Sequence, residues 1–200
     1  MIAKYISYLL HPLLMPTYGI TLIFNINSYL TFVTPYELKK AVYIITFVST
    51  FLLPASSSYL LLARGYIKNL SMESFEERRL PFLLAATFYS LGYFLCSLLP
   101  LPAPIRLMLL GANLTVIIAL IINLKWKISV HMIGIGGILG AIIGLSYRLM
   151  IDLRFEITLL ILCVGIVGYA RLRLKAHDPS QVYAGFLLGV ISELFLLVFF

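Results

Sequence analysis

Charged residues are scarce in this sequence. Lys, Arg, Asp and Glu make up 12% of its 200 residues, whereas hydrophobic residues make up 62%. A soluble domain carries about 25% charged residues, because water must solvate its surface. The low charge therefore excludes an ordinary soluble domain. Since one membrane-spanning helix needs about 20 apolar residues, the chain predicts an all-α, polytopic transmembrane bundle of about six or seven helices, with a single domain over 1–200.

Cysteine is nearly absent too. Cys96 and Cys163 are the only two in the sequence, and both lie within apolar runs. This placement indicates packing residues rather than a disulfide or a metal site, so neither a metal nor a cofactor is expected. The first apolar segment is not followed by the small-residue cleavage pattern of a secretory signal, so we expect it to be retained.

Acidic residues are outnumbered, and the net charge is +7. Because no soluble basic domain is expected, nucleic acid is not an expected partner. The excess is typical of cytoplasmic loops and of contact with anionic membrane lipids. The distribution of Lys and Arg leaves the orientation in the membrane open, and the oligomeric state is not determined by the sequence.

Long apolar segments mark the expected helices. They cover about 12–33, 40–65, 80–99, 105–124, 129–150, 155–171 and 179–200, and the proline-rich stretch 100–104 separates two of them. Two prolines, Pro12 and Pro16, interrupt the start of the first. The 5–17 stretch is therefore either interfacial or re-entrant, or it is the kinked beginning of a normal span.

Glycines recur every four residues in two of these segments. They are Gly136, Gly140 and Gly144 in the fifth expected helix, and Gly185 and Gly189 in the seventh. Small residues at this spacing let helix backbones approach closely in lipid. We therefore predict that the fifth and seventh helices pack against each other.

Polar residues gather in three connecting segments. A helical hairpin returns the chain to the face it left, so 67–79, 125–131 and 171–181 should share one membrane face. Together they hold most of the basic residues and two of the three histidines. Asp178 followed by Pro179 is typical of a helix start. Clustered cations indicate an anionic ligand such as phosphate; the alternative is the ordinary positive charge of a cytoplasmic face.

Histidines at two expected helix starts favour the ligand interpretation. His131 and His177 each lie beside basic residues, and imidazole serves as a nucleophile or proton carrier near neutral pH. One histidine could attack phosphorus and form a phospho-histidine while the other protonates the leaving oxygen. Nearby cations would hold the phosphoryl oxygens as charge shifts.

Around these residues the sequence resembles the type 2 phosphatidic acid phosphatase (PAP2) superfamily. Its third motif, Ser-Arg, five residues, His, three residues, Asp, corresponds to the stretch from Ala170 to Gln181, with the same spacing from Arg171 to His177. The second motif, Pro-Ser-Gly-His, corresponds to 128–131. The first, a lysine, six residues, then Arg-Pro, is reduced to 78–81. The resemblance covers about 65–200 and implies a PAP2-like core there.

The resemblance implies a role for each matching residue. His177 is the expected nucleophile and His131 the general acid and then base. Gln181 orients His177 in place of the family's aspartate. The phosphate-binding residues are expected to be Arg171 and Arg79, with Arg78, Lys127 and Ser129 as helpers.

This interpretation implies a metal-independent phosphatase of the bacterial inner (cytoplasmic) membrane. Its substrate would be a lipid phosphate: a phosphatidate, a prenyl (pyro)phosphate or a lipid A type. Because Gln181 lacks the charge of an aspartate and the first two motifs are altered, the alternative is a non-catalytic protein that binds or transports an anionic lipid.

A third hypothesis is an unrelated transporter in which Glu193 carries protons. Otherwise we expect Glu193 to make a helix–helix hydrogen bond. His11, next to Pro12, is expected to lie at the membrane interface.

Overall fold

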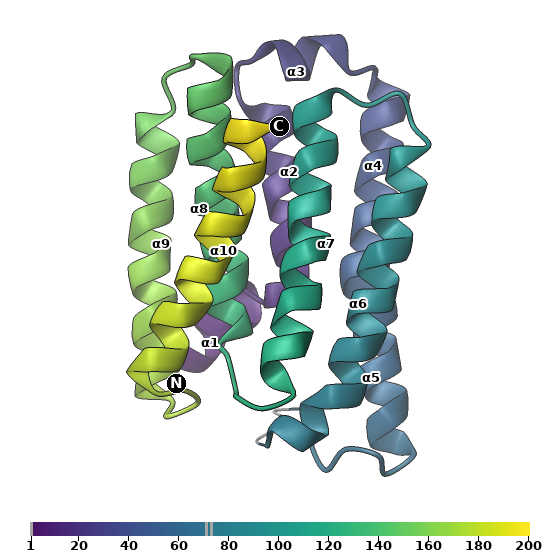
Figure 1. The fold of residues 1–200 in the computed structure, drawn as a ribbon, viewed down its shortest axis with the longest axis vertical. Coiled ribbons are helices and arrows are strands. Elements are labelled where there is room, and N and C mark those ends of the chain that lie inside the picture. The colour runs from purple at the N-terminus through teal and green to yellow at the C-terminus, as the bar shows by residue number, and fades with distance from the viewer. Residues whose placement is uncertain (1, 71, 73) are drawn as a thin grey trace.

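The computed structural model describes residues 2–70, 72 and 74–200 and shows an all-helical bundle there (Figure 1). Its elements are α1 (Ile2–Leu9), a 3₁₀ turn (Pro12–Leu14), α2 (Met15–Asn25), α3 (Tyr29–Val33), α4 (Tyr36–Phe47), a π-helical turn (Val48–Leu52), α5 (Leu53–Ala63), α6 (Phe75–Ser97), α7 (Ala103–Asn123), α8 (Val130–Leu149), α9 (Arg154–Arg173) and α10 (Pro179–Phe199).

Seven helical segments in the described residues are long and apolar enough to cross a membrane. Large apolar side chains also face outward along these helices; on α9 they include Leu159, Ile161 and Leu162. Such a surface would be a large apolar patch in water, whereas lipid solvates it. The chain therefore has the architecture of an integral membrane protein, as its composition predicts.

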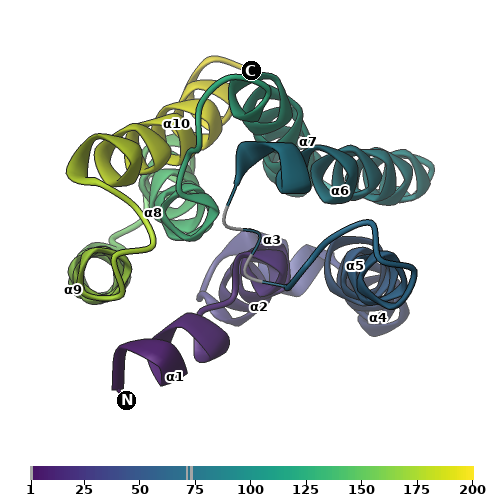
Figure 2. The same cartoon turned by 90° about the horizontal axis from the view of Figure 1, so that it is seen from below.

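The first span differs from the prediction. A helix was expected over about 12–33, but the span covers Ile2–Asn25 and is broken before Pro12, while Tyr29–Val33 forms the separate short helix α3. Proline disfavours a helical conformation in the preceding residue, and His11 is extended with ψ of 134°. From below, α2 is seen nearly along its axis, whereas α1 runs across the view (Figure 2).

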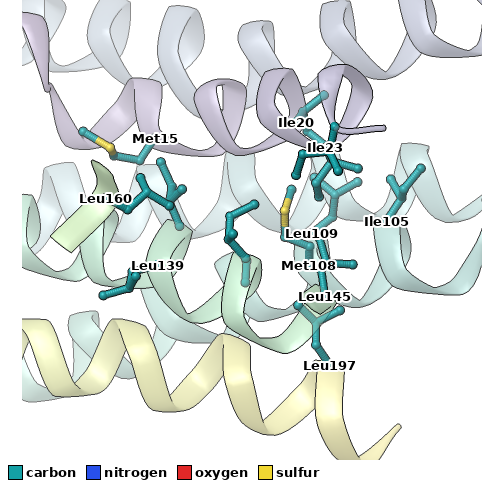
Figure 3. Packing of buried hydrophobic residues seen from close by; sticks show 14 of the residues in the cluster. Met15, Ile20, Ile23, Ile105, Met108, Leu109, Leu139, Leu145, Leu160 and Leu197 are labelled. Carbon is teal, nitrogen blue, oxygen red and sulfur yellow. The ribbon is translucent and has the colours of Figure 1, made fainter. Parts of the chain in front are cut away.

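Helix α8 lies at the centre of the bundle and packs against α2, α7, α9 and α10. Apolar side chains from these five helices meet in one core (Figure 3). The labelled members of this core are Met15, Ile20, Ile23, Ile105, Met108, Leu109, Leu139, Leu145, Leu160 and Leu197. The core fixes α8, and with it the position of His131 in its first turn.

The predicted glycine contact between α8 and α10 is confirmed. A Cβ at Gly189 would lie 2.2 Å from the carbonyl oxygen of Ile133, and one at Gly140 would lie 2.4 Å from that of Val190. Similarly, a Cβ at Gly136 or Gly185 would approach a facing carbonyl oxygen to 2.6 Å. The two backbones therefore touch, and α10 is held firmly against the central helix.

Replacing Gly189 with alanine should destabilise the protein, because the new methyl group meets backbone that cannot rotate away. Overpacking of this kind costs about 1–3 kcal/mol. Gly165 on α9 is the matched control, since a Cβ there would have no atom within 4 Å, and Gly→Ala in a helix is otherwise favourable. We expect the thermal unfolding midpoint in detergent to fall for Gly189→Ala and not for Gly165→Ala. Equal midpoints would contradict the contact.

The connections α5–α6, α7–α8 and α9–α10 lie at the same end of the bundle, the lower end in Figure 1, as the hairpin argument predicts. Helix α1 lies at this end too, whereas α3 and the C-terminus lie at the other. The lower end thus brings together residues that are far apart in the sequence.

Candidate functional site

A cavity of about 960 Å³ lies inside the bundle. Its lining comes from helices α1, α2 and α5 to α10 and from the connections at the lower end. Apolar and small side chains make up much of the wall. The ionisable lining residues apart from tyrosine are Lys4, His11, Arg78, Lys127, His131, Arg171, Lys175, His177 and Glu193. The cavity is therefore amphipathic, with many more cations than carboxylates.

His177 lies directly before α10. The Asp178 side chain accepts a hydrogen bond from the backbone N–H of Gln181 at 2.9 Å, and Pro179 begins the helix. The predicted helix start is therefore confirmed. Nδ1 of His177 lies 2.8 Å from Oε1 of Gln181. A carbonyl oxygen can only accept, so this partner assigns the proton to Nδ1 and the lone pair to Nε2.

The environment of His177 favours its neutral form. Burial, with smaller contributions from the nearby cations Arg78, Lys127 and Arg171, lowers the pKa of this imidazole to about 4, against an opposing contribution from the Gln181 hydrogen bond. Charging a buried imidazole beside cations is unfavourable. At neutral pH the Nε2 lone pair of His177 is thus available to an electrophile.

His131 and Arg171 form a second cluster in the same cavity. Nδ1 of His131 lies 3.4 Å from Nη1 of Arg171, and Nε2 lies 3.2 Å from the carbonyl oxygen of Ser7. Since guanidinium only donates and a carbonyl only accepts, the proton belongs on Nε2. Nη2 of Arg171 donates to the Ser7 hydroxyl.

Arg171 retains donor capacity. Its side chain is buried, and Nε has no hydrogen-bond partner among the described residues. A buried guanidinium N–H without a partner is costly and needs an explanation. The Nε atom is itself buried, so an anionic ligand in the cavity would reach it only after the guanidinium turns.

Two further cations line the cavity. Arg78 is buried, and it donates from Nε to the Met72 carbonyl at 2.9 Å and from Nη1 to the Ile128 carbonyl at 3.4 Å. Lys127 is half-buried, on the connection before α8. The sequence-predicted residues that line the cavity are thus His131, His177, Arg78, Lys127 and Arg171.

The remaining predicted residues lie elsewhere. Arg79 is exposed, donates to the Leu124 carbonyl at 3.3 Å and does not line the cavity. Ser129 is fully buried at the α8–α10 contact, where its amide donates to the Gln181 carbonyl. Ser129 does not line the cavity either. Gln181 also lies outside the lining, but its side chain contacts His177, which lines the cavity.

Sequence reasoning missed the contribution of the N-terminal segment. His11 was expected at the interface, but its ring centroid lies 5.9 Å from that of His131 in an edge-on arrangement, and it lines the cavity. Ser7 and Lys4 on α1 also line it, as does Lys175. The break at His11-Pro12 was visible in the sequence, whereas the direction of α1 relative to α2 was not.

Glu193 lines the apolar part of the cavity. Its side chain is 4% exposed, and Oε2 makes no hydrogen bond in the described structure. The expected helix–helix hydrogen bond is therefore not found at this atom. The carboxyl faces Gly111 of α7 instead, and a Cβ added at Gly111 would lie 2.5 Å from Oε2.

The described residues contain no cluster of three or more His, Cys, Asp or Glu side chains that could hold a metal ion. Comparisons of the chain with protein-family models, curated proteins and solved structures gave no match. What the site can do is therefore inferred from the cavity itself, which offers acid–base groups and anion-binding cations.

Proposed function

We propose that this protein is a membrane phosphatase that hydrolyses a lipid phosphate through a phospho-histidine intermediate, without a metal. The observation that carries the proposal is that His177 and His131 line one cavity together with three of the predicted cations. The lowered pKa of His177 agrees with a nucleophilic role. The sequence resemblance to the PAP2 superfamily supports it independently, because it assigns the same two histidines.

The first step is attack on phosphorus by Nε2 of His177. A P–N bond forms while the bond from phosphorus to the lipid oxygen breaks. Arg171, Arg78 and Lys127 hold the phosphoryl oxygens, whose charge is redistributed in the transition state. The bound dianion favours protonation of His131, which then gives its Nδ1 proton to the leaving oxygen and releases the lipid alcohol.

The second step reverses these roles. Nδ1 of His131 accepts a proton from water as the water oxygen attacks the phospho-histidine. The P–N bond breaks, His177 recovers its lone pair and inorganic phosphate leaves. The net reaction consumes one water and yields an alcohol and phosphate, so no redox partner is required.

The substrate class follows from the position of the site. Arg78 lies in the first turn of α6, Lys127 in the α7–α8 connection and Arg171 in the last turn of α9. The same cavity is also lined by many apolar side chains and by Glu193 of α10. An amphiphile with an anionic head fits both parts. We propose a phosphatidate, a prenyl (pyro)phosphate or a lipid A type phosphate, and, from the resemblance, the bacterial inner membrane as the location.

Binding of an anionic lipid without turnover is the second candidate function. The observation that favours it is Gln181, because a neutral amide holds His177 where a carboxylate would stabilise the imidazolium by charge. This candidate function uses the same cations to bind the lipid, and it differs only in that the phosphate ester is not hydrolysed.

Phosphate release from a panel of lipid phosphates, measured on the protein in detergent with and without EDTA, tests the proposal. We expect release from at least one substrate class at the same rate in both conditions, because no step uses a metal. No release by folded protein, together with binding of the same lipids, would replace the phosphatase by the second candidate.

A further inference from the structure

Ser7 makes three hydrogen bonds that meet at the site. Its hydroxyl donates to the Ala3 carbonyl at 2.8 Å and accepts from Nη2 of Arg171. Its own carbonyl oxygen lies 3.2 Å from Nε2 of His131. One residue of α1 therefore contacts both Arg171 on α9 and His131 on α8.

The carbonyl of Ser7 is available because α1 ends early. Within a helix this oxygen would accept from the amide four residues later, which belongs to His11. Pro12 keeps His11 extended, and α1 ends at Leu9. The last carbonyls of a helix lack partners, and the imidazole N–H of His131 supplies one for Ser7.

The hydroxyl of Ser7 is oriented to accept a hydrogen bond from a cation. Because its proton is used by the Ala3 carbonyl, the oxygen presents only lone pairs to Arg171. The guanidinium is thereby oriented with Nη1 toward His131, while α1 packs along α9. Ser7 thus fixes the orientation of both the Arg171 guanidinium and the His131 imidazole.

We propose that Ser7 is a positioning residue of the site. Its carbonyl holds the Nε2 proton of His131, which makes Nδ1 the reacting nitrogen, and its hydroxyl directs Arg171 to the same side. A phosphoryl group bound by Arg171 then lies next to Nδ1. This role rests on the proposed function, and it makes α1 part of the site as well as the beginning of the first span.

Three variants test the role of the hydroxyl. Ser7→Ala removes the contact with Arg171, Ser7→Thr retains a hydroxyl, and Ser56→Ala is the matched control. The Ser56 hydroxyl donates to the Leu52 carbonyl at 2.7 Å, the same kind of local bond, on α5 and outside the cavity. Loss of an outer partner of a site residue reduces affinity or activity about 10–100-fold.

We expect kcat/KM for the best lipid phosphate to fall about 10–100-fold in Ser7→Ala, to return to within a few-fold of the natural value in Ser7→Thr, and to stay unchanged in Ser56→Ala. The thermal unfolding midpoints of the two alanine variants should be alike. Unchanged kcat/KM in Ser7→Ala, or a fall without recovery in Ser7→Thr, would overturn the role of Ser7 and leave the phosphatase standing.

Binding of inorganic phosphate, measured by calorimetry on the same proteins, separates the two proposals. If the natural protein hydrolyses no lipid phosphate but binds phosphate, and Ser7→Ala binds it about 10-fold or more weakly, Ser7 positions Arg171 at an anion site and the phosphatase fails. If the natural protein neither hydrolyses nor binds, both proposals are overturned.

Discussion

Replacing His177 with alanine should abolish lipid-phosphate hydrolysis, with a loss of about a thousandfold or more in kcat, as is typical of nucleophile removal. Among the described histidines, His177 is the one whose lone-pair nitrogen, Nε2, has no hydrogen-bond donor among the described residues, whereas Nδ1 of each of the other two lies next to a donor. Without it the P–N bond cannot form. Binding of the phosphate should be largely retained, because the cations Arg78, Lys127 and Arg171 remain in the cavity.

The measurement is trapping of the intermediate. Protein mixed with phosphorus-labelled substrate and quenched in base should carry label that acid releases, as a phospho-histidine does, and His177→Ala should carry none. Tyr183→Ala is the control, since Tyr183 is exposed on α10 and outside the cavity. Substantial hydrolysis by His177→Ala would exclude this nucleophile.

The pH dependence of kcat/KM for the natural protein tests the direction of the pKa shift of His177. The proposed attack requires a neutral His177, and the pKa of His177 is lowered to about 4 by burial and by nearby cations. The acidic limb of kcat/KM that belongs to the nucleophile should therefore lie near pH 4 rather than near 6.5.

Replacing His131 with alanine should have the second largest effect, and one that depends on the leaving group. Loss of a general acid costs about 10²–10⁴ in rate. An alkyl alkoxide needs a proton to leave, so release of lipid alcohol should fall by this factor. A nitrophenolate leaves without one, so phosphorylation by a nitrophenyl phosphate should fall much less.

The second step supplies the matching test. In the proposed mechanism His131 also activates water. We therefore expect His131→Ala mixed with a nitrophenyl phosphate to release about one nitrophenol per protein in a burst and then to slow down as phospho-histidine accumulates. Equal losses for alkyl and aryl substrates with no burst would contradict the acid–base role and indicate a structural one.

Much of the bundle could be predicted because lipid imposes strict rules on sequence. Span length, hairpin parity and the glycine spacing on α8 and α10 each depend on local sequence, and the structure agrees with them. The first span could not be predicted in the same way. Pro12 reveals a break, but the direction of α1 is set by its packing on α9, which no local pattern encodes.

Tertiary packing also explains why some site residues could not be predicted from the sequence. Arg78 and Arg79 are neighbours, yet one faces the cavity and the other the outside. Successive residues on an α-helix point about 100° apart, so the choice depends on how α6 is rotated within the bundle. Ser7 was missed because its carbonyl, an unremarkable backbone group in sequence, becomes a site group only where α1 ends.

The glycine contact between α8 and α10 bears on how the site comes into being during synthesis. Helix α10 follows the other described helices in the chain and therefore leaves the ribosome after them; His177 lies directly before it, and its glycines contact the backbone of α8. Until it docks, α1, α8 and α9 can bring together Ser7, His131 and Arg171, but not His177, the proposed nucleophile. Docking of α10 thus forms the α8–α10 contact and assembles the proposed site in a single event.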